Sequence, residues 1–210
     1  MRQNKKPYII GVAGNSGSGK GAVCKILEDL GCLVIDCDRL AHENMARGGC
    51  AYNDIVNAFG EEILGENGEI DRRILGGIVF NDKQKLELLN QIAHGHIKKR
   101  LCEIIEKSAD KAYIAIDAPL LREAGLMPLC DTAWLVDADE NIRLERVMRR
   151  DGITREKALE RFKNQMPSFY HHDVFNFIIM NNYDDISQLG PIVKKAFYAL
   201  NEQAEQNGRI

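Results

Sequence analysis

The stretch Gly14-Asn-Ser-Gly-Ser-Gly19-Lys20 decides the fold of this 210-residue chain. It follows a short apolar run, Tyr8–Ala13, that is typical of a buried strand, and a helix is expected from about Lys20 to Leu30. Strand, glycine-rich turn, lysine and helix come in the order of a P-loop, the G-x-x-x-x-G-K pattern that binds nucleotide phosphates. The alternative is a glycine-rich turn without a ligand, and the lysine at the required position argues against it.

Each part of this loop has a chemical reason. Glycines let successive backbone N–H groups curl around phosphate oxygens, and a helix that begins at Lys20 adds the positive end of its dipole. Lys20 is expected to reach the outer phosphates and to offset the charge that develops during transfer. ATP is therefore predicted to bind at Gly14, Asn15, Ser16, Gly17, Ser18, Gly19, Lys20, Gly21 and Ala22.

The end of the motif lacks the hydroxyl that commonly binds Mg²⁺. The full pattern has Ser or Thr after the lysine, whereas this chain has Gly21 and then Ala22. A glycine at this point also occurs in adenylate kinases, which resemble the stretch in that respect, so phosphate and water can hold most of the ion. The missing hydroxyl is therefore expected to affect phosphoryl transfer more than nucleotide binding.

Four further apolar runs complete a predicted sheet. They are Cys32–Asp36, Tyr113–Asp117, Thr132–Val136 and Phe177–Met180. Continuous apolar runs separated by helical patterns indicate parallel strands that are covered on both faces. We therefore predict an α/β fold of the three-layer P-loop kinase type, with a five-stranded parallel sheet flanked by helices.

The segments between the strands are expected to be helical and to form one domain over residues 1–210. Residues 39–107 stand where P-loop kinases usually carry their acceptor-binding region. Residues 143–165 contain two charged helices joined by Asp151-Gly152, and we expect them to form a lid. A final amphipathic helix is predicted from Ser187 to Ala204.

Composition limits the partners and the location. The net charge is −3 and the basic residues are scattered, which argues against a nucleic-acid surface. No stretch reaches the ~18 uninterrupted apolar residues of a membrane helix, and the N-terminus lacks the apolar core of a signal peptide. The six cysteines form no CxxC pair and do not fall at zinc-ligand spacing from the histidines. We expect a soluble cytoplasmic protein with reduced thiols and a small-molecule substrate.

Two carboxylates, Asp36 and Asp38, stand at the carboxyl end of the predicted second strand, the edge where ligands bind in open α/β sheets. They point the same way if the strand continues. A carboxylate there can accept the proton of an attacking hydroxyl and hold a Mg²⁺-bound water. The alternative is that Asp38 caps a helix over Arg39–Met45. Position and pairing favour the functional role.

Taken in order, the motifs along the chain resemble those of the dephospho-coenzyme A kinase family nearly from end to end. The first are Gly14–Lys20 and Val34–Ala41. The middle segments match at Gly68–Arg72, Leu75, Ile78–Phe80, Leu89-Asn90, His94 and Ile97. The later ones match at Asp117–Leu121, Glu123, Arg146, Arg150-Asp151, Ala158, Arg161, Gln165 and Asn181. The chain departs from the family at Gly95, Arg122 and Met180, where His-Pro, Phe and Asp are usual in the family.

The resemblance implies transfer of the γ-phosphoryl group of ATP to the ribose 3′-hydroxyl of dephospho-coenzyme A, the last step of coenzyme A synthesis. Asp38 occupies the family's general-base position. Arg146 and Arg150 lie four residues apart, on one helix face, and would stabilise the transferring group as the lid closes; the alternative is a solvated charged helix. Arg72, His94 and Pro119 match acceptor-binding positions, although Arg72 and His94 are equally compatible with structural hydrogen bonds.

Three functions stay open at this point. The first is an active dephospho-coenzyme A kinase. The second is a kinase for another nucleotide-like acceptor. The third is a nucleotide-binding protein that has lost phosphoryl transfer and acts as a sensor or partner.

Overall fold

The structure is a computed structural model that describes residues 6–163, 165, 173–183 and 185–206. It divides into two compact units. The sheet unit comprises residues 1–35 and 108–210, and the helical unit comprises residues 36–107. Asn164, at the end of the second predicted lid helix, lies outside the described residues. That residues 1–210 act as one kinase domain stays a prediction.

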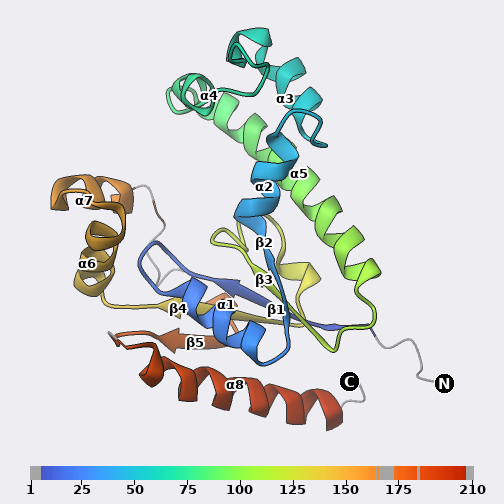
Figure 1. The fold of residues 1–210 in the computed structure, drawn as a ribbon, viewed down its shortest axis with the longest axis vertical. Coiled ribbons are helices and arrows are strands. Elements are labelled where there is room, and N and C mark those ends of the chain that lie inside the picture. Colours follow the sequence, from blue (N-terminus) through green and yellow to red (C-terminus); the bar gives the residue numbers. More distant parts are fainter. Residues whose placement is uncertain (1–5, 164, 166–172, 184, 207–210) are drawn as a thin grey trace. The chain divides into compact units, whose positions relative to one another are not determined.

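The predicted five-stranded parallel sheet is confirmed (Figure 1). The strand order is β2-β3-β1-β4-β5. The strands are β1 (Tyr8–Ala13), β2 (Leu33–Asp36), β3 (Tyr113–Asp117), β4 (Thr132–Asp137) and β5 (Phe177–Met180). Because β1 lies at the centre, the loop that follows it leaves the middle of the sheet's carboxyl edge.

One face of the sheet is covered by α1 (Lys20–Asp29) and α8 (Ile186–Gln206), which pack against each other (Figure 1). Buried side chains of both helices share a core with β1, β3, β4 and β5, including Leu27, Trp134 and Phe197. This packing explains why the strand sequences are almost entirely apolar.

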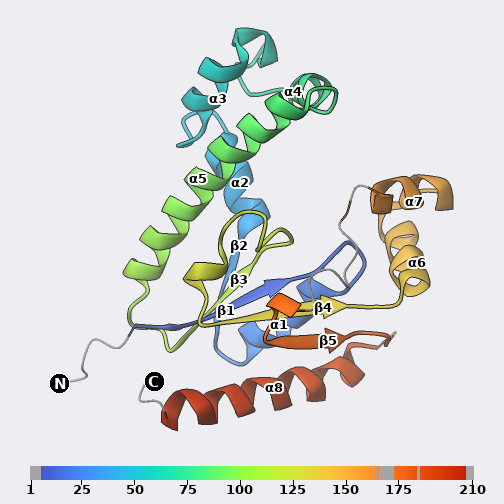
Figure 2. The same ribbon diagram turned by 180° about the vertical axis from the view of Figure 1, so that it is seen from behind.

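The other face is covered in part by the segment between β3 and β4, which contains the short helix η2 (Met127–Leu129); Figure 2 gives the view from behind. A Cβ placed on Gly11 of β1 would collide with Leu121 and Cys130 of this segment. The glycine is therefore required for close packing rather than for an unusual backbone angle.

Two further helices of the sheet unit, α6 (Glu140–Asp151) and α7 (Arg155–Lys163), follow β4. They join at Gly152, whose positive φ of 63° ends α6 in the left-handed conformation. Leu144, Val147 and Ala158 form a small buried core between them. The two charged helices predicted for this region are therefore present.

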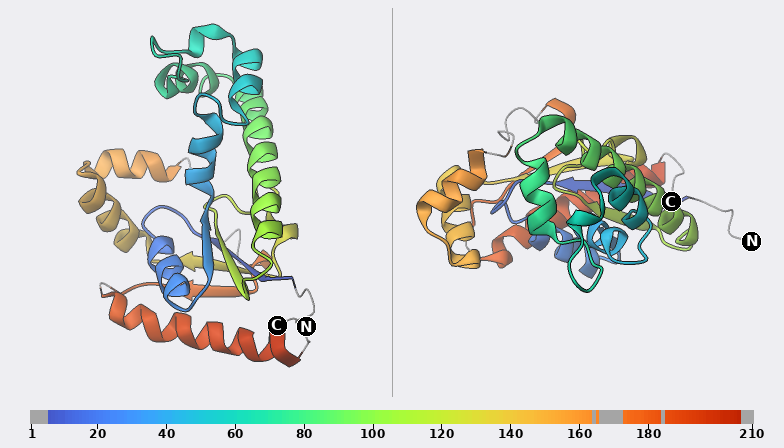
Figure 3. Two further views of the ribbon diagram at one scale, coloured as in Figure 1. Left: turned by 45° about the vertical axis from the view of Figure 1, so that its right-hand side comes forward. Right: turned by 90° about the horizontal axis from the view of Figure 1, so that it is seen from above.

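The helical unit contains α2 (Cys37–Met45), α3 (Tyr52–Phe59), η1 (Glu61–Ile63), α4 (Arg72–Val79) and α5 (Lys83–Lys107). Helices α2 and α5 lie side by side (Figure 3), and α3 and α4 also contact α5. The core of the unit includes Ile55, Ile63 and Leu75. Within the described residues, no helix is long and apolar enough to cross a membrane.

Candidate active site

The loop between β1 and α1 has the backbone that a phosphate cradle needs. Gly17 and Gly19 have positive φ angles of 81° and 89°, which residues with a Cβ rarely adopt. Helix α1 begins at Lys20, its N-cap Gly19 makes no side-chain capping bond, and its first turn contains no acidic residue. No side chain therefore caps this end of the helix within the described residues, an arrangement that suits an anion.

Ser18 lies at the centre of this loop and is completely buried. Its hydroxyl has no hydrogen-bond partner within the described residues, whereas its carbonyl accepts a bond of 2.8 Å from the amide of Asn181. A buried donor without a partner is costly unless a ligand or water completes it. The hydroxyl lies against Gly14, where an added Cβ would come within 2.7 Å of it, so the close packing inside the loop requires a glycine there.

Lys20, the lysine of the motif, forms an ion pair with Asp117 at the carboxyl end of β3. The two side chains are only 15% and 13% exposed. The contact fixes the lysine at the edge of the loop and compensates its charge while no anion is bound. Asp117 is thus also a carboxylate at the site where Mg²⁺ and phosphates are expected.

Arg146 of α6, the helix that follows β4, binds the same loop. Its guanidinium donates to the carbonyls of Gly17, at 3.2 Å, and Asn181, at 2.9 Å, and also to that of Tyr183. The amide of Asn181 occupies the space that a Cβ on Gly19 would need. In this arrangement Arg146 holds the loop together with the chain after β5, and its role towards a transferring phosphoryl group stays a prediction.

A second arginine of α6, Arg143, is 7% exposed and connects the loop to Gln165 and to Phe162 of α7. It donates to the Ser16 carbonyl at 3.1 Å and to the side chain of Gln165 at 3.1 Å, and its guanidinium lies 4.6 Å from the centre of the Phe162 ring. Gln165 in turn donates to the Ser16 hydroxyl at 2.8 Å. Burial lowers the pKa of Arg143 from its ordinary value, and the Asp137 carboxylate opposes that shift.

Arg150 makes a different set of contacts. It forms two bonds with Asp151, at 2.7 and 3.0 Å, and Arg161 of α7 pairs with the same carboxylate. Hydrogen bonds from Arg150 and then Arg161 hold the pKa of Asp151 well below its usual value. Although Arg146 and Arg150 belong to one helix, the first binds the loop and the second binds Asp151, whose carboxylate also joins α6 to α7 through Arg161.

Asp36 and Asp38 differ from the geometry expected for them. The strand ends at Asp36, and α2 begins at the next residue, Cys37, so the alternation that would point both carboxylates the same way does not continue. Asp36 is the N-cap: its carboxylate accepts from the N–H groups of Asp38 and Arg39, at 2.9 and 3.0 Å. The expected alternative, a cap formed by Asp38, is therefore wrong as well. Asp38 is exposed in the first turn.

The residues predicted to bind the acceptor lie in different units. Pro119 lines a cavity of about 110 Å³ beside Gly14 and Asn15, all within the sheet unit. Arg72 begins α4 in the helical unit and contacts His42 there. His94 is half-buried on α5. Their part in acceptor binding stays a prediction.

The residues expected to hold Mg²⁺ are carboxylates. Within the described residues, no group of three or more histidine, cysteine, aspartate or glutamate side chains is placed to hold an ion. The carboxylates of Asp36, Asp38 and Asp117 are nevertheless ligands of the kind that Mg²⁺ accepts through water, because this ion keeps much of its hydration shell. Phosphate oxygens would have to supply the remaining direct ligands.

Four of the described residues that contact the loop or its lysine received no role from the sequence: Asp117, Arg143, Gln165 and Asn181. A signal was available for Asp117, because it ends a buried strand at the ligand-binding edge in the same way as Asp36. Asn181 and Gln165 matched the family motifs but carried no role there, whereas Arg143 gave no signal, since it lies 127 residues from the Ser16 carbonyl that it binds.

Comparison with known proteins supplies independent evidence. A family model described as dephospho-CoA kinase matches residues 8–186. A dephospho-CoA kinase of Carboxydothermus hydrogenoformans is 42% identical over 163 residues, covering 76% of this chain and 78% of the relative. One of Moorella thermoacetica is 43% identical over 162 residues, covering 75% and 76%.

Solved structures agree with the fold. The TT1252 protein of Thermus thermophilus superposes with a TM-score of 0.78 at 31% identity, covering 95% of this chain and 98% of that one. A shikimate kinase of Acinetobacter baumannii, at 13% identity and a TM-score of 0.52 over 93% and 95% of the two chains, shares the fold alone.

Proposed function

Because this chain belongs to the dephospho-CoA kinase family, we propose that it transfers the γ-phosphoryl group of ATP to the ribose 3′-hydroxyl of dephospho-coenzyme A. The observation that carries the proposal is the loop before α1. It contains two glycines of positive φ, and it leads into a helix whose N-terminus has no side-chain cap. The first residue of that helix is Lys20, which pairs with Asp117. Donors and a cation at one helix end suit a nucleotide triphosphate.

In the proposed reaction the ribose oxygen forms a bond to the γ-phosphorus, and the bond between that phosphorus and the β,γ-bridging oxygen breaks, releasing ADP. Asp38 accepts the hydroxyl proton. Lys20 offsets the charge on the outer phosphate oxygens, and on binding it exchanges part of its contact with Asp117 for phosphate. Arg146 and Arg150 are proposed to act on the same phosphoryl group when the lid closes.

The remaining predicted residues bind the two substrates. The backbone of residues 14–22 holds ATP, and Arg72, His94 and Pro119 contact the acceptor. Bound Mg²⁺ would neutralise phosphate charge, and Asp36, Asp38 and Asp117 would hold it through water. Gly21 and Ala22 offer it no hydroxyl.

A coupled assay of ADP formation tests the proposal with dephospho-coenzyme A, unmodified nucleosides and nucleoside monophosphates as separate acceptors. The proposal expects turnover with dephospho-coenzyme A and a product phosphorylated at the 3′ position. Lys20→Ala, purified in parallel, controls for contaminating kinases and should show no turnover. Turnover with another acceptor alone would support a different substrate, and tight ATP binding without any turnover would support a protein that has lost transfer.

A further inference from the structure

The helical unit contains a cavity of about 330 Å³ that none of the predicted site residues lines. Its walls come from the end of α2, the turn after it and the middle of α5, so it lies wholly within one unit. The volume is at the lower end of the range of small-molecule sites. His94 is not among its walls, because residues 96, 99, 100 and 103 lie on the other side of α5 at 100° per residue.

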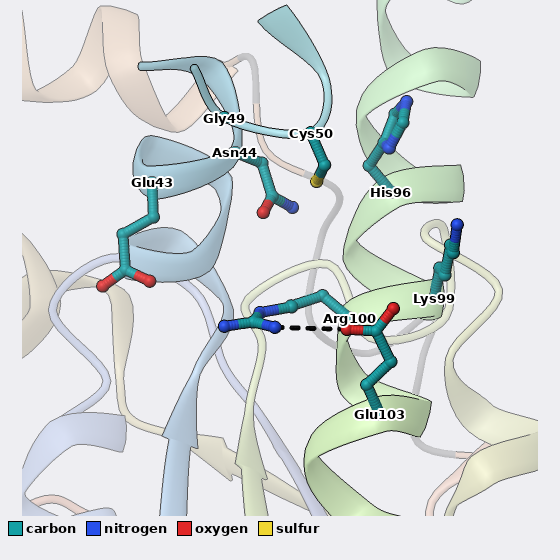
Figure 4. Close-up of a pocket in the computed structure, with 8 residues that line it drawn as sticks. All are labelled: Glu43, Asn44, Gly49, Cys50, His96, Lys99, Arg100 and Glu103. Atoms are coloured by element: carbon teal, nitrogen blue, oxygen red, sulfur yellow. Dashed lines mark hydrogen bonds and ion pairs between the residues drawn. The ribbon is translucent and has the colours of Figure 1, made fainter. Parts of the chain in front are cut away.

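Asn44 is the first sign that this cavity is built for a ligand. It is 5% exposed, and its Nδ2 atom has no hydrogen-bond partner within the described residues. Figure 4 shows the amide pointing from α2 into the cavity. A leucine at this position would bury the same volume without an unsatisfied donor, so the asparagine is costly unless an acceptor reaches it.

The side chains around the cavity also offer more hydrogen-bond donors and positive charge than their acidic neighbours take up. Both acidic residues in its wall have basic partners: Glu43 lies 3.5 Å from Arg39, and Glu103 lies 3.1 Å from Arg100. Lys99 makes no ion pair or hydrogen bond in the part of the chain that the structure describes. Arg100 uses one nitrogen on Glu103 and has further N–H groups to donate. The missing partner is thus an acceptor.

We propose that this cavity binds a small molecule through an anionic oxygen group, a phosphate or a carboxylate. Asn44 Nδ2 donates to it from α2, and Lys99 and Arg100 supply charge from α5. Charge-assisted bonds of this kind are stronger than neutral ones. The site is additional to the proposed kinase site and does not rest on that function.

Cys50 gives a local readout, because it lines the cavity and is the exposed one among the six cysteines. The full-length protein is treated with iodoacetamide in the presence of sodium pyrophosphate or sodium citrate at constant ionic strength, and the alkylation rate of each cysteine is followed by peptide mass spectrometry. At three-quarters occupancy the rate at Cys50 should fall about fourfold by mass action. The rates at Cys102 and Cys130 should not change.

Variants on α5 assign the effect to the cavity. Lys99→Ala should weaken the protection of Cys50, whereas Lys98→Ala, its exposed neighbour that does not line the cavity, should leave it intact. Asn44→Leu should also weaken it; should that variant not fold, the pair of lysine variants still decides. Protection must persist in Lys20→Ala, which excludes an effect transmitted from the P-loop.

The two probes separate the sources of the anion. Protection by pyrophosphate alone supports a phosphate ligand, by citrate alone a carboxylate ligand, and by both a site for oxyanions of either kind. No protection by either probe would overturn the proposal. The proposal would also be overturned if the anions protected Cys50 equally well in Lys99→Ala, or if protection were lost in Lys20→Ala. Protection of Cys50 by putrescine, a cation, in place of the anions would overturn it too.

Discussion

Two neighbouring strands, β2 and β3, both end in an aspartate at the ligand-binding edge, but the two carboxylates make different contacts. Asp36 binds the N–H groups of the helix that begins one residue later. No helix follows Asp117 directly, and its carboxylate pairs instead with Lys20, 97 residues away in sequence. In these two strands, the element that follows decides what the last carboxylate of the strand binds. Where a helix begins at once, the carboxylate caps that helix; where none does, it pairs with the lysine of the loop.

The largest expected effect is at Asp38, whose N–H group donates to the Asp36 cap but whose own carboxylate does not cap the helix. Asp38→Asn should lower turnover by ~100-fold or more, the scale for losing a general base, and leave ATP affinity nearly unchanged. Steady-state kinetics and calorimetric titration with ATP measure the two quantities. Since Asp36 is the cap, the melting temperature should hardly change. Normal turnover together with a lower melting temperature would show that Asp38 is structural.

Asp117 should contribute more to stability than an exposed carboxylate does. Asp117→Ala leaves the Lys20 ammonium, 15% exposed, without its carboxylate, and should lower the free energy of unfolding by about 3 kcal/mol. Urea denaturation measures this change. Asp117→Asn is the matched variant, because it keeps an acceptor of the same shape and should cost less. Equal and small losses in both would mean that the ion pair does not stabilise the fold.

Asp36→Ala is the corresponding test of the other strand end. Removal of the cap should lower the free energy of unfolding by about 1 kcal/mol, whereas Asp36→Asn, a side chain that caps helices equally well, should be nearly neutral. If Asp36 also holds a Mg²⁺-bound water, both variants raise the Mg²⁺ concentration needed for half-maximal rate. A stability loss in the Asn variant as large as that in the Ala variant would contradict the capping role.

The smallest expected effect is at Gly21, next to the lysine. A Cβ there meets no atom within 4 Å, so Gly21→Ser restores the missing hydroxyl without a collision. It should lower the Mg²⁺ concentration for half-maximal rate several-fold and leave acceptor choice unchanged. Gly21→Ala is the matched control for backbone effects and should not shift the Mg²⁺ requirement. An equal shift in both variants would argue against a metal contact.

Asp36 makes local contacts and Asp117 a distant one, and the same difference separates what the sequence could predict from what it could not. The five strands were predicted within a residue at each end, because apolar runs and turn glycines act locally. The glycine loop and its lysine were predicted for the same reason. The start of α2 was expected at Arg39 and lies at Cys37, because the last residue of the strand is also the helix cap.

The contacts that shape the loop could not be predicted in this way. In the sequence, Arg143 is indistinguishable from the other charged residues of an amphipathic helix. Its burial against Ser16 and Phe162 follows only from the packing of α6 and α7 beside the loop. Arg146 carried a functional prediction from the family resemblance, but no periodicity predicts that its guanidinium binds the carbonyls of Gly17 and Asn181. Such contacts depend on tertiary structure rather than on residue type.

The bond between Asn181 and Ser18 also has a consequence for the order in which a growing chain can mature. The loop leaves the ribosome before the amide that occupies the space beside Gly19, because that amide is made 163 residues later. Contacts so distant in sequence form slowly and late. The nascent chain therefore carries a glycine loop that cannot make its hydrogen bond with Asn181 until β5 has emerged.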